Sequence, residues 1–367
     1  MSIKAVSANI DGTQNHIKLS RNPFKKFSML WQEMMQDLRT VRILRLSIGA
    51  TIAMALAYAI NWPLAMLTPV FTVVFLSLPF PRPTLYLGFR NMMQTLLAVA
   101  IGVLFTLYLL PMPFVFSLMF GLALFQTYYM INRGGSFWFV LMLLISLLLM
   151  PMMANIDGSL AIGVSMGFVW SGWVAVWMIF LAHFLIPDPE SQVIPQRPPM
   201  HKGYVPAAAD LALKSTLVAF PLALIFVAFQ LTDYILVMIN AAIFTLSPDL
   251  SKGRQAISNS LISTLMGGVI AYIFYWILVA VSEYYFFMLL FFLVVLVFAS
   301  RIFSDRSDAQ YYSSALVAMI ILFNGSMGED KDFTSIFVTR VILMSLAGVY
   351  VILALKVLDR YWPFSAK

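Results

Sequence analysis

Long, nearly uninterrupted apolar stretches are the feature that most constrains this chain. Twelve can be counted between turns and charged loops: residues 42–60, 64–78, 91–110, 114–131, 137–153, 161–186, 210–231, 234–247, 257–281, 284–303, 311–326 and 335–358. A helix needs about 20 apolar residues to cross a bilayer, and shorter ones need polar ends or local thinning. The pattern predicts an all-α polytopic membrane protein with about twelve transmembrane helices.

The composition excludes several other classes of protein. Of the 367 residues, 61% are hydrophobic and 11% are charged, whereas a soluble domain carries about 25% charged residues. A soluble enzyme and a disordered chain are therefore excluded. An outer-membrane barrel is excluded too, because its strands read as alternating segments of about ten residues. With no cysteine in the chain, disulfides and thiolate chemistry are impossible.

Lysine and arginine predict how the helices are oriented. If the apolar stretches cross the membrane alternately, all of the 23 basic residues except Lys331 and Arg340 fall on one side. Basic residues concentrate in cytoplasmic loops, so both termini are predicted to be cytoplasmic. The net charge of +7 then reflects orientation in the lipid bilayer, and no nucleic-acid partner is expected.

A proline-rich, charged stretch at residues 187–209 is predicted to be a cytoplasmic linker between two membrane halves, 42–186 and 210–358. Six stretches in each half imply the same topology, so we expect two parallel six-helix repeats. The short stretches 64–78 and 234–247 support this, because each ends near proline (LSLPFPRP, TLSPDLSKG) and leads into a basic loop.

The two ends of the chain are predicted to be cytoplasmic tails, residues 1–41 and 359–367. Within the first, residues 24–41 have apolar side chains at helical spacing opposite charged ones. This predicts an amphipathic helix, lying either on the cytoplasmic leaflet or on the protein's own cytoplasmic face.

The motifs of soluble catalysis are missing from the sequence. There is no Walker A pattern and no metal-ligand spacing, and the three histidines are scattered. We therefore expect no enzyme activity, no cofactor and no metal, and transport becomes the leading class. No Asp or Glu lies in the middle of an apolar stretch. The acids for proton coupling would then be Asp308 or Asp210 near segment ends, unless these are solvated helix caps; Asp249 is a third such acid.

Neutral polar residues inside the membrane are the candidates for binding substrate, because polar groups at that depth are costly. They are Gln94 and Asn259, which begin equivalent stretches, Asn240 in the short stretch 234–247, and Thr68 and Thr72 in the short stretch 64–78. Short segments at matching positions point to a transporter's central site. The side-chain amides of Gln94, Asn240 and Asn259 could hydrogen-bond a carboxylate. The alternative is interhelical hydrogen bonding, worth about 0.6 kcal/mol on average; Asn324 in 311–326 is a further amide of this kind.

Three arginines could attract an anion. Arg90 and Arg254 mark the cytoplasmic mouth of equivalent stretches, and Arg340 lies near the outer end of the last one. The alternatives are orientation anchors for the first two and a snorkelling or ion-paired side chain for Arg340. The spacing of Gly163 and Gly167 predicts close helix packing, within the bundle or between protomers.

The run TPVFTVVFLSLPFPRPTLYLGFRNMMQTLLAVAIG resembles the fusaric-acid-resistance and aromatic-acid-exporter superfamily, and AAIFTLSPDLSKGRQAISNSLISTLMGG echoes it in the second half. The family usually has Gly–Thr near the arginine, where this chain has Gln94–Thr95. Because only the linker 187–209 stands where many members carry a large cytoplasmic domain, the chain resembles the compact membrane-only branch of unassigned function (DUF2955-like).

The resemblance implies an inner-membrane exporter of aromatic carboxylic acids that works with a periplasmic membrane-fusion adaptor. The sequence therefore predicts proton-linked efflux of a small organic anion through a site between the halves, in a homo-oligomer. The alternatives are a passive organic-anion channel, which distant plant relatives of the family suggest, and a non-transporting scaffold for an adaptor. An enzyme embedded in the membrane is a more distant possibility.

Overall fold

The computed structural model describes residues 37–62, 64–78, 83–188, 203–231, 250–306, 308–325 and 333–361, with the pairs 238–239, 241–242 and 245–246. The secondary structure of these residues consists of eleven helices: α3 (Leu38–Ile60), α4 (Leu67–Leu76), α5 (Leu85–Leu109), α6 (Pro113–Asn132), α7 (Phe137–Ile156), α8 (Gly158–Leu185), α9 (Pro206–Ala228), α11 (Leu250–Ala280), α12 (Tyr284–Ile302), α13 (Ala309–Gly325) and α14 (Phe333–Tyr361). Each coincides with one predicted stretch. Most of stretch 234–247 and most of the amphipathic segment 24–41 lie outside the described residues.

The chain is a multi-pass membrane protein. Nine of the described helices are long and apolar enough to cross a membrane, and α4 and α13 are shorter apolar helices. The outer helices expose large apolar side chains such as Phe114, which is 84% exposed, and Tyr285, which is 81% exposed. Such surfaces would promote aggregation in water but suit contact with lipid. The prediction of an all-α polytopic membrane protein is confirmed.

Several helices begin before their apolar stretch does, on the side predicted to be cytoplasmic. Helix α5 begins at Leu85 because the Thr84 side chain accepts the N–H of Leu87. Helix α9 begins at Pro206, inside the stretch expected to be linker, and proline is favoured in a first helical turn. Asp37 caps α3, and its pKa is lowered chiefly by a hydrogen bond from the Thr40 hydroxyl.

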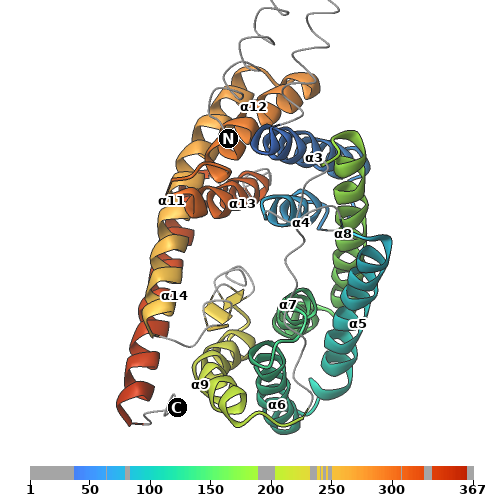
Figure 1. The fold of residues 1–367 in the computed structure, drawn as a ribbon. Helices are drawn as coiled ribbons and strands as arrows, with labels where there is room; N and C mark the ends of the chain where they lie inside the picture. The colour runs from blue at the N-terminus through green and yellow to red at the C-terminus, as the bar shows by residue number, and fades with distance from the viewer. Residues whose placement is uncertain are drawn as a thin grey trace, which may run out of the picture.

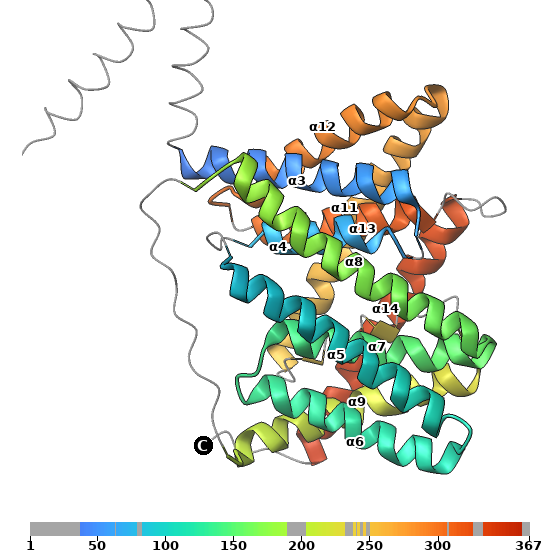
Figure 2. The same cartoon turned by 90° about the vertical axis from the view of Figure 1, so that its right-hand side faces the viewer.

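The helices form a ring around a few central ones (Figure 1). The most extensive helix pairs are α11 with α13, α5 with α7, α6 with α9, and α12 with α3. The first two pairs each lie on one side of residues 187–209 in the sequence, whereas the last two join helices from opposite sides of that stretch. Viewed from the side, α3 begins and α8 ends at the same edge of the bundle (Figure 2).

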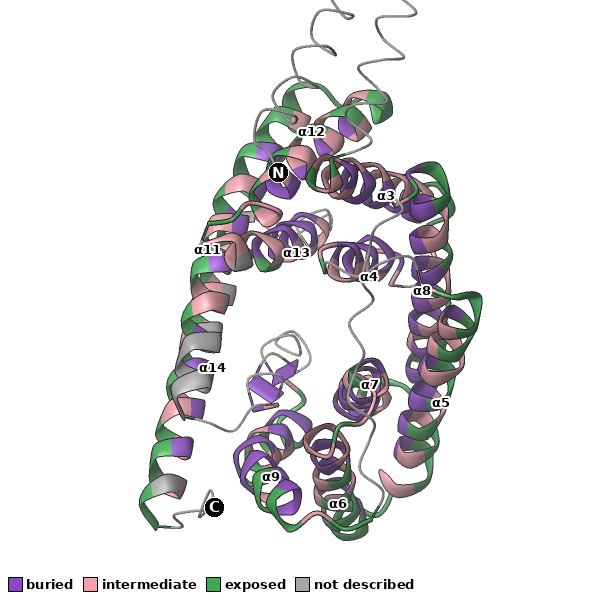
Figure 3. Ribbon diagram, viewed as in Figure 1, coloured by how far each residue is buried: buried purple, intermediate pink, exposed green. Residues whose placement is uncertain are grey.

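Burial separates central from peripheral helices. In the most apolar window of α7, 67% of the residues are buried, against 28% in α5. Figure 3 shows α7, α4 and α13 with mainly buried residues, while α12, α5 and α6 carry exposed faces outward. In α7 the buried set runs almost without a break from Met142 to Met152. Helix α7 therefore packs against protein on nearly all sides.

Candidate functional site

Buried polar side chains of the described residues occur on most of the helices, among them Thr68 and Thr72 on α4, Ser171 on α8 and Ser215 on α9. At the start of α4, Ser171 of α8 organises the backbone. Its hydroxyl accepts the indole N–H of Trp62 (2.8 Å) and donates to the carbonyl of Leu64 (2.9 Å). Leu64 has a φ of 61°, a conformation that is costly for a branched residue. Ser171 thus stabilises the turn that precedes α4.

Thr68 and Thr72, predicted to bind substrate, are both buried on α4. The Thr68 hydroxyl donates to the carbonyl of Ser171 (3.4 Å), and the Thr72 hydroxyl donates to the carbonyl of Thr68 (2.8 Å). The nearest atoms to a side chain built at Gly49 of α3 include the Thr72 methyl. Both threonines therefore face the α3–α8 side of α4, with hydrogen bonds already made.

Gln94 lies where α5 meets the start of α7. Its side-chain carbonyl accepts a hydrogen bond from the Ser136 hydroxyl (2.9 Å), and Ser136 also caps α7. Beside it, the Trp138 indole N–H lies 3.1 Å from the carbonyl of Asn91 and 3.0 Å from the Thr95 hydroxyl. The structure thus groups Gln94 with Ser136 and Trp138, apart from the partners of Thr68 and Thr72.

The remaining predicted residues occupy the helix ends or lie outside the description. Arg90 is exposed in the second turn of α5, and Asn259 is half-buried on α11. Asp210 is exposed on α9, and the backbone carbonyl of half-buried Asp308 accepts the N–H of Tyr311 at the start of α13. Asn240 lies outside the described residues, as do the side chains of Arg254 and Arg340. The geometry does not assemble these residues into one described site.

Of the predicted packing pair on α8, Gly167 is buried, whereas Gly163 is only partly covered and a side chain built there would meet open space. The α8 glycine in close contact is Gly172, where an added Cβ would lie 3.0 Å from the Thr95 methyl of α5.

A buried ion pair escaped the sequence analysis. Arg45 of α3 is 3% exposed, and its guanidinium lies 2.6 Å from the carboxylate of Asp188 and donates to the carbonyl of Ile186 (3.1 Å). The sequence analysis counted Arg45 only as one of many basic residues that set orientation. Lys214 of α9, the first helix described after residues 187–209, is also buried, at 5% exposed. The sequence signal that could have predicted these buried charges was a basic residue near the start of each of two apolar stretches, 42–60 and 210–231.

Two asparagines near the ends of central helices make matching contacts. The Asn155 amide of α7 donates to the carbonyl of Val227 on α9 (3.0 Å). The Tyr58 hydroxyl of α3 donates to the side-chain carbonyl of Asn324 on α13 (2.8 Å). The same number of residues separates Asn155 from Asn324 as separates Tyr58 from Val227 and Arg45 from Lys214. Asn155 therefore joins α7 to α9, and Asn324 joins α13 to α3.

The described part of 234–247 is held from two sides. The Tyr128 hydroxyl of α6, fully buried, donates to the carbonyl of Ala242 (3.0 Å) and lies 2.8 Å from the Thr245 hydroxyl. The Ser215 hydroxyl of α9 donates to the carbonyl of Thr245 (2.6 Å). These contacts dock Ala242 against α6 and Thr245 against α6 and α9.

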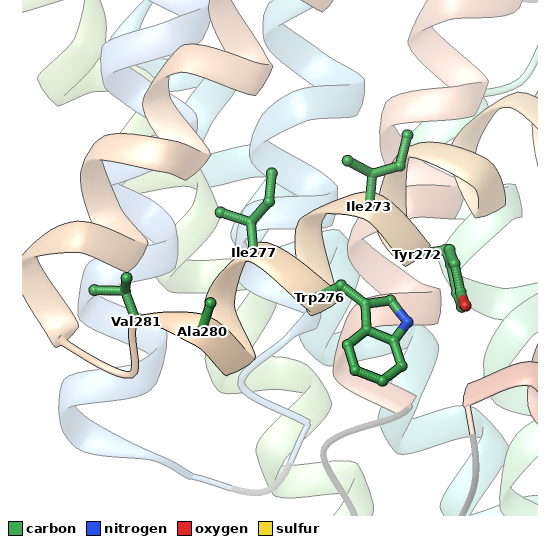
Figure 4. Close-up of a pocket in the computed structure, with 6 residues that line it drawn as sticks. All are labelled: Tyr272, Ile273, Trp276, Ile277, Ala280 and Val281. Atoms are coloured by element: carbon green, nitrogen blue, oxygen red, sulfur yellow. The ribbon is translucent and has the colours of Figure 1, made fainter.

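The open grooves of the surface are apolar. One groove, of about 660 Å³, lies at the end of α11 and is lined by Tyr272, Ile273, Trp276, Ile277, Ala280 and Val281. Figure 4 shows these six side chains. A smaller one of about 270 Å³ lies at the matching end of α5, lined by Thr106, Leu107, Leu110, Pro111, Ala154 and Gly158. Neither lining offers a charge for a carboxylate, and the exposed aliphatic side chains suit lipid chains.

The fold defines a multi-pass α-helical membrane protein. Residues 42–182, which cover α3 to most of α8, match the model of a family described as a protein of unknown function, DUF2955. No curated protein and no solved structure matches the chain. The matched region coincides with the predicted first membrane half, and it agrees with the likeness drawn from the sequence to a membrane branch of unassigned function.

Proposed function

We propose that this protein exports small organic anions, with aromatic carboxylic acids as the leading class, across a bacterial inner membrane by proton-linked exchange. The observation that best supports the proposal is how the short or deeply buried elements at the centre of the bundle are held. Short or deeply buried elements, including α4 and residues 242–245, are held there by neutral hydroxyl and amide groups inside a ring of lipid-facing helices. Interrupted central segments of this kind are typical of transporter substrate sites. The substrate class comes from the resemblance to aromatic-acid exporters.

The proposal includes two parallel six-helix repeats, with residues 234–247 as the twelfth transmembrane segment and both termini cytoplasmic. Equivalent contacts of the two halves support it: Asn155 with Val227, and Asn324 with Tyr58. The last turns of α3 and α9 support it as well. Asn61 and Gln230 both have left-handed backbone angles, with φ of 51° and 53°, and they stand at the same spacing as the asparagines.

The predicted residues then take the following roles. Arg90 and Arg254 concentrate anions on the cytoplasmic side, Asn240, Asn259 and Gln94 bind the carboxylate, and Arg340 attracts it at the outer mouth. Asp308 or Asp210 carries the coupling proton. A periplasmic membrane-fusion adaptor would accept the exported acid.

Uptake into inverted membrane vesicles tests the proposal. Labelled benzoate and a panel of aliphatic acids are offered with and without an uncoupler, and the expected result is uptake of benzoate that collapses with the uncoupler. Asn240→Ala and Asn259→Ala should each reduce uptake at unchanged abundance. Asn132→Ala is the matched control, because the Asn132 amide donates only to the carbonyl of Tyr128 in its own helix. Unimpaired uptake by the first two variants would overturn the site.

A passive anion channel is the second candidate, favoured by the lack of an acidic residue in the middle of any apolar stretch. It predicts uptake that follows the anion gradient and ignores the uncoupler. No uptake of any acid, with the protein present in the vesicles, would instead favour a scaffold for an adaptor.

A further inference from the structure

Helix packing divides the molecule along a different line from the linker. One group, called bundle A here, contains α3, α4, α11, α12 and α13. The other, bundle B, contains α5, α6, α7, α9 and the described residues 242–245. The helix pairs that pack extensively in the described structure lie within one bundle or involve α8 or α14. Each bundle therefore mixes helices of both sequence halves.

Hydrogen bonds between the halves tie bundle A together. The Ser313 hydroxyl of α13 donates to the Ser77 hydroxyl after α4 (2.9 Å). The Tyr284 hydroxyl at the start of α12 donates to the carbonyl of Ala55 on α3 (3.1 Å). Together with the bond between Tyr58 and Asn324, these contacts join the two halves at both ends of the bundle.

Bundle B is joined across the halves in the same way. Asn155 of α7 binds the backbone of α9, and Tyr128 of α6 binds residues 242 and 245. The rings of Phe120 on α6 and Phe220 on α9 lie 6.3 Å apart between centroids. Helices α6 and α9 thus form one packed unit although the linker separates them in the sequence.

Within the described part of the chain, ring contacts join the two bundles at the end of α4 and the start of α7. The Trp138 ring is 4.5 Å from the Phe75 ring and 5.6 Å from the Phe71 ring. The Trp138 indole N–H is fixed by groups of α5, within bundle B. The two phenyl rings belong to α4, within bundle A. One bundle therefore holds the indole in place, while the other supplies the rings that cover it.

We infer that bundles A and B, rather than the two sequence halves, are the rigid units that move during transport, and that Trp138 with Phe71 and Phe75 closes the predicted cytoplasmic side between them. This inference rests on the proposed transport function. Tightly packed helices move as blocks, and their interfaces switch between discrete arrangements. In parallel repeats the two halves are commonly the moving units. Here the fourth helix of each half packs on the first helix of the other, so movement of the halves would break the α6–α9 and α3–α12 contacts.

Two cross-links separate the alternatives, and the chain offers a natural background because it has no cysteine. The first is Ser77→Cys with Ser313→Cys, whose parent hydroxyls lie 2.9 Å apart, within reach of a disulfide. It joins the two halves within bundle A. Benzoate uptake should stay within about twofold of the reduced sample if the bundles move. A loss of about tenfold or more would show that the halves move and would overturn the inference.

The second cross-link is Phe75→Cys with Trp138→Cys, joined by a short reagent that a reductant cleaves. It lies within the first half and joins the two bundles. Uptake should fall about tenfold or more on cross-linking and return on reduction, and unchanged uptake would count against the closure. Trp138→Phe checks the anchoring separately, because it keeps a ring but removes the hydrogen bond to α5.

A spectroscopic distance measurement keeps the inference testable without transport. Spin labels at Leu118 of α6 and Leu217 of α9, both on exposed faces, should give one narrow distance in nanodiscs, with or without benzoate. Labels at Leu118 and at exposed Leu293 of α12 should give a distance that broadens or shifts. A broad α6–α9 distance, or a single narrow α6–α12 distance under both conditions, would overturn the bundles. Absence of benzoate uptake by the unmodified protein would count against the proposed function alone.

Discussion

Helices α8 and α14 close the two halves of the chain, yet they are packed differently. Helix α8 packs extensively against α3, α4, α5 and α7, whereas α14 packs mainly along α11 and makes smaller contacts with α9 and α13. In their most apolar windows, 44% of α8 is buried and 24% of α14. A last helix held by four neighbours leaves less of its surface to lipid than one held mainly by a single neighbour.

The contacts of α8 are also more polar and more constrained. Beyond its last turn, Asp188 forms an ion pair with Arg45 of α3, and in its middle the Ser171 hydroxyl donates to the carbonyl of Leu64 before α4. The Trp173 indole donates to the carbonyl of Met92 on α5 (3.1 Å). Helix α14 makes its hydrogen bond to α9 through the Tyr350 hydroxyl, which donates to the carbonyl of Val218 (2.9 Å). We therefore expect mutations around α8 to cost more stability than those around α14.

The largest effect is expected at the ion pair. Arg45→Met leaves the partly buried Asp188 carboxylate without this guanidinium. Because breaking a fully buried pair costs about 3–5 kcal/mol, we expect a loss at the lower end of that range. Denaturant unfolding in mixed micelles measures the free energy of unfolding. Arg45→Met combined with Asp188→Asn is the control, because removing both charges should recover a large part of the loss. An Arg45→Met protein as stable as the parent would show that the pair does not fix α8.

The next effect compares two glycines near α8. A Cβ at Gly88 of α5 would lie 2.3 Å from the Phe180 ring of α8, whereas one at Gly163 of α8 would meet open space. Gly88→Ala should destabilise by about 1–3 kcal/mol, as overpacking does. Gly163→Ala should be neutral or slightly stabilising, because alanine favours helix over glycine. Thermal stability in detergent compares the two, and equal effects would contradict the packing of α5 on α8.

A smaller effect is expected for Ser171→Ala. The variant removes the acceptor of the Trp62 indole and the donor to the Leu64 carbonyl. Leaving buried polar groups unsatisfied costs about 1–3 kcal/mol. Ser165→Ala is the matched control on the same helix, since its hydroxyl donates only to the carbonyl of Ile162. If the two variants lose the same stability, Ser171 does not support the turn before α4.

The smallest effect is expected on the α14 side. Tyr350→Phe removes the hydrogen bond to Val218 while keeping the ring, and interhelical hydrogen bonds in membranes average about 0.6 kcal/mol. The same micelle titration should resolve a small loss, with Tyr108→Phe as control, because Tyr108 of α5 is 72% exposed. A loss larger than that of Ser171→Ala would reverse the comparison and make α14 the better-anchored helix.

The candidate site was only partly predictable. The sequence analysis named Thr68, Thr72 and Gln94 because polar residues within apolar stretches are costly, and the structure places all three in hydrogen bonds between or within helices. It assigned no contact to Arg45, Asn155 or Tyr128. Their partners are Asp188, Val227 and residues 242 and 245, and pairing across such distances in the chain depends on how the helices are arranged.

By itself, the sequence determined that the chain is a helical membrane protein and where eleven of its helices lie. The length and continuity of an apolar stretch are local properties, and a long apolar stretch is stable in a bilayer as a helix. The tertiary structure decided which helices are neighbours. Helix faces that contact lipid and helix faces that contact protein are both mostly apolar. The periodicity of apolar residues therefore does not distinguish the two kinds of face. Helix contacts depend instead on close packing and a few hydrogen bonds, and those placed α6 on α9 and α12 on α3, across the linker.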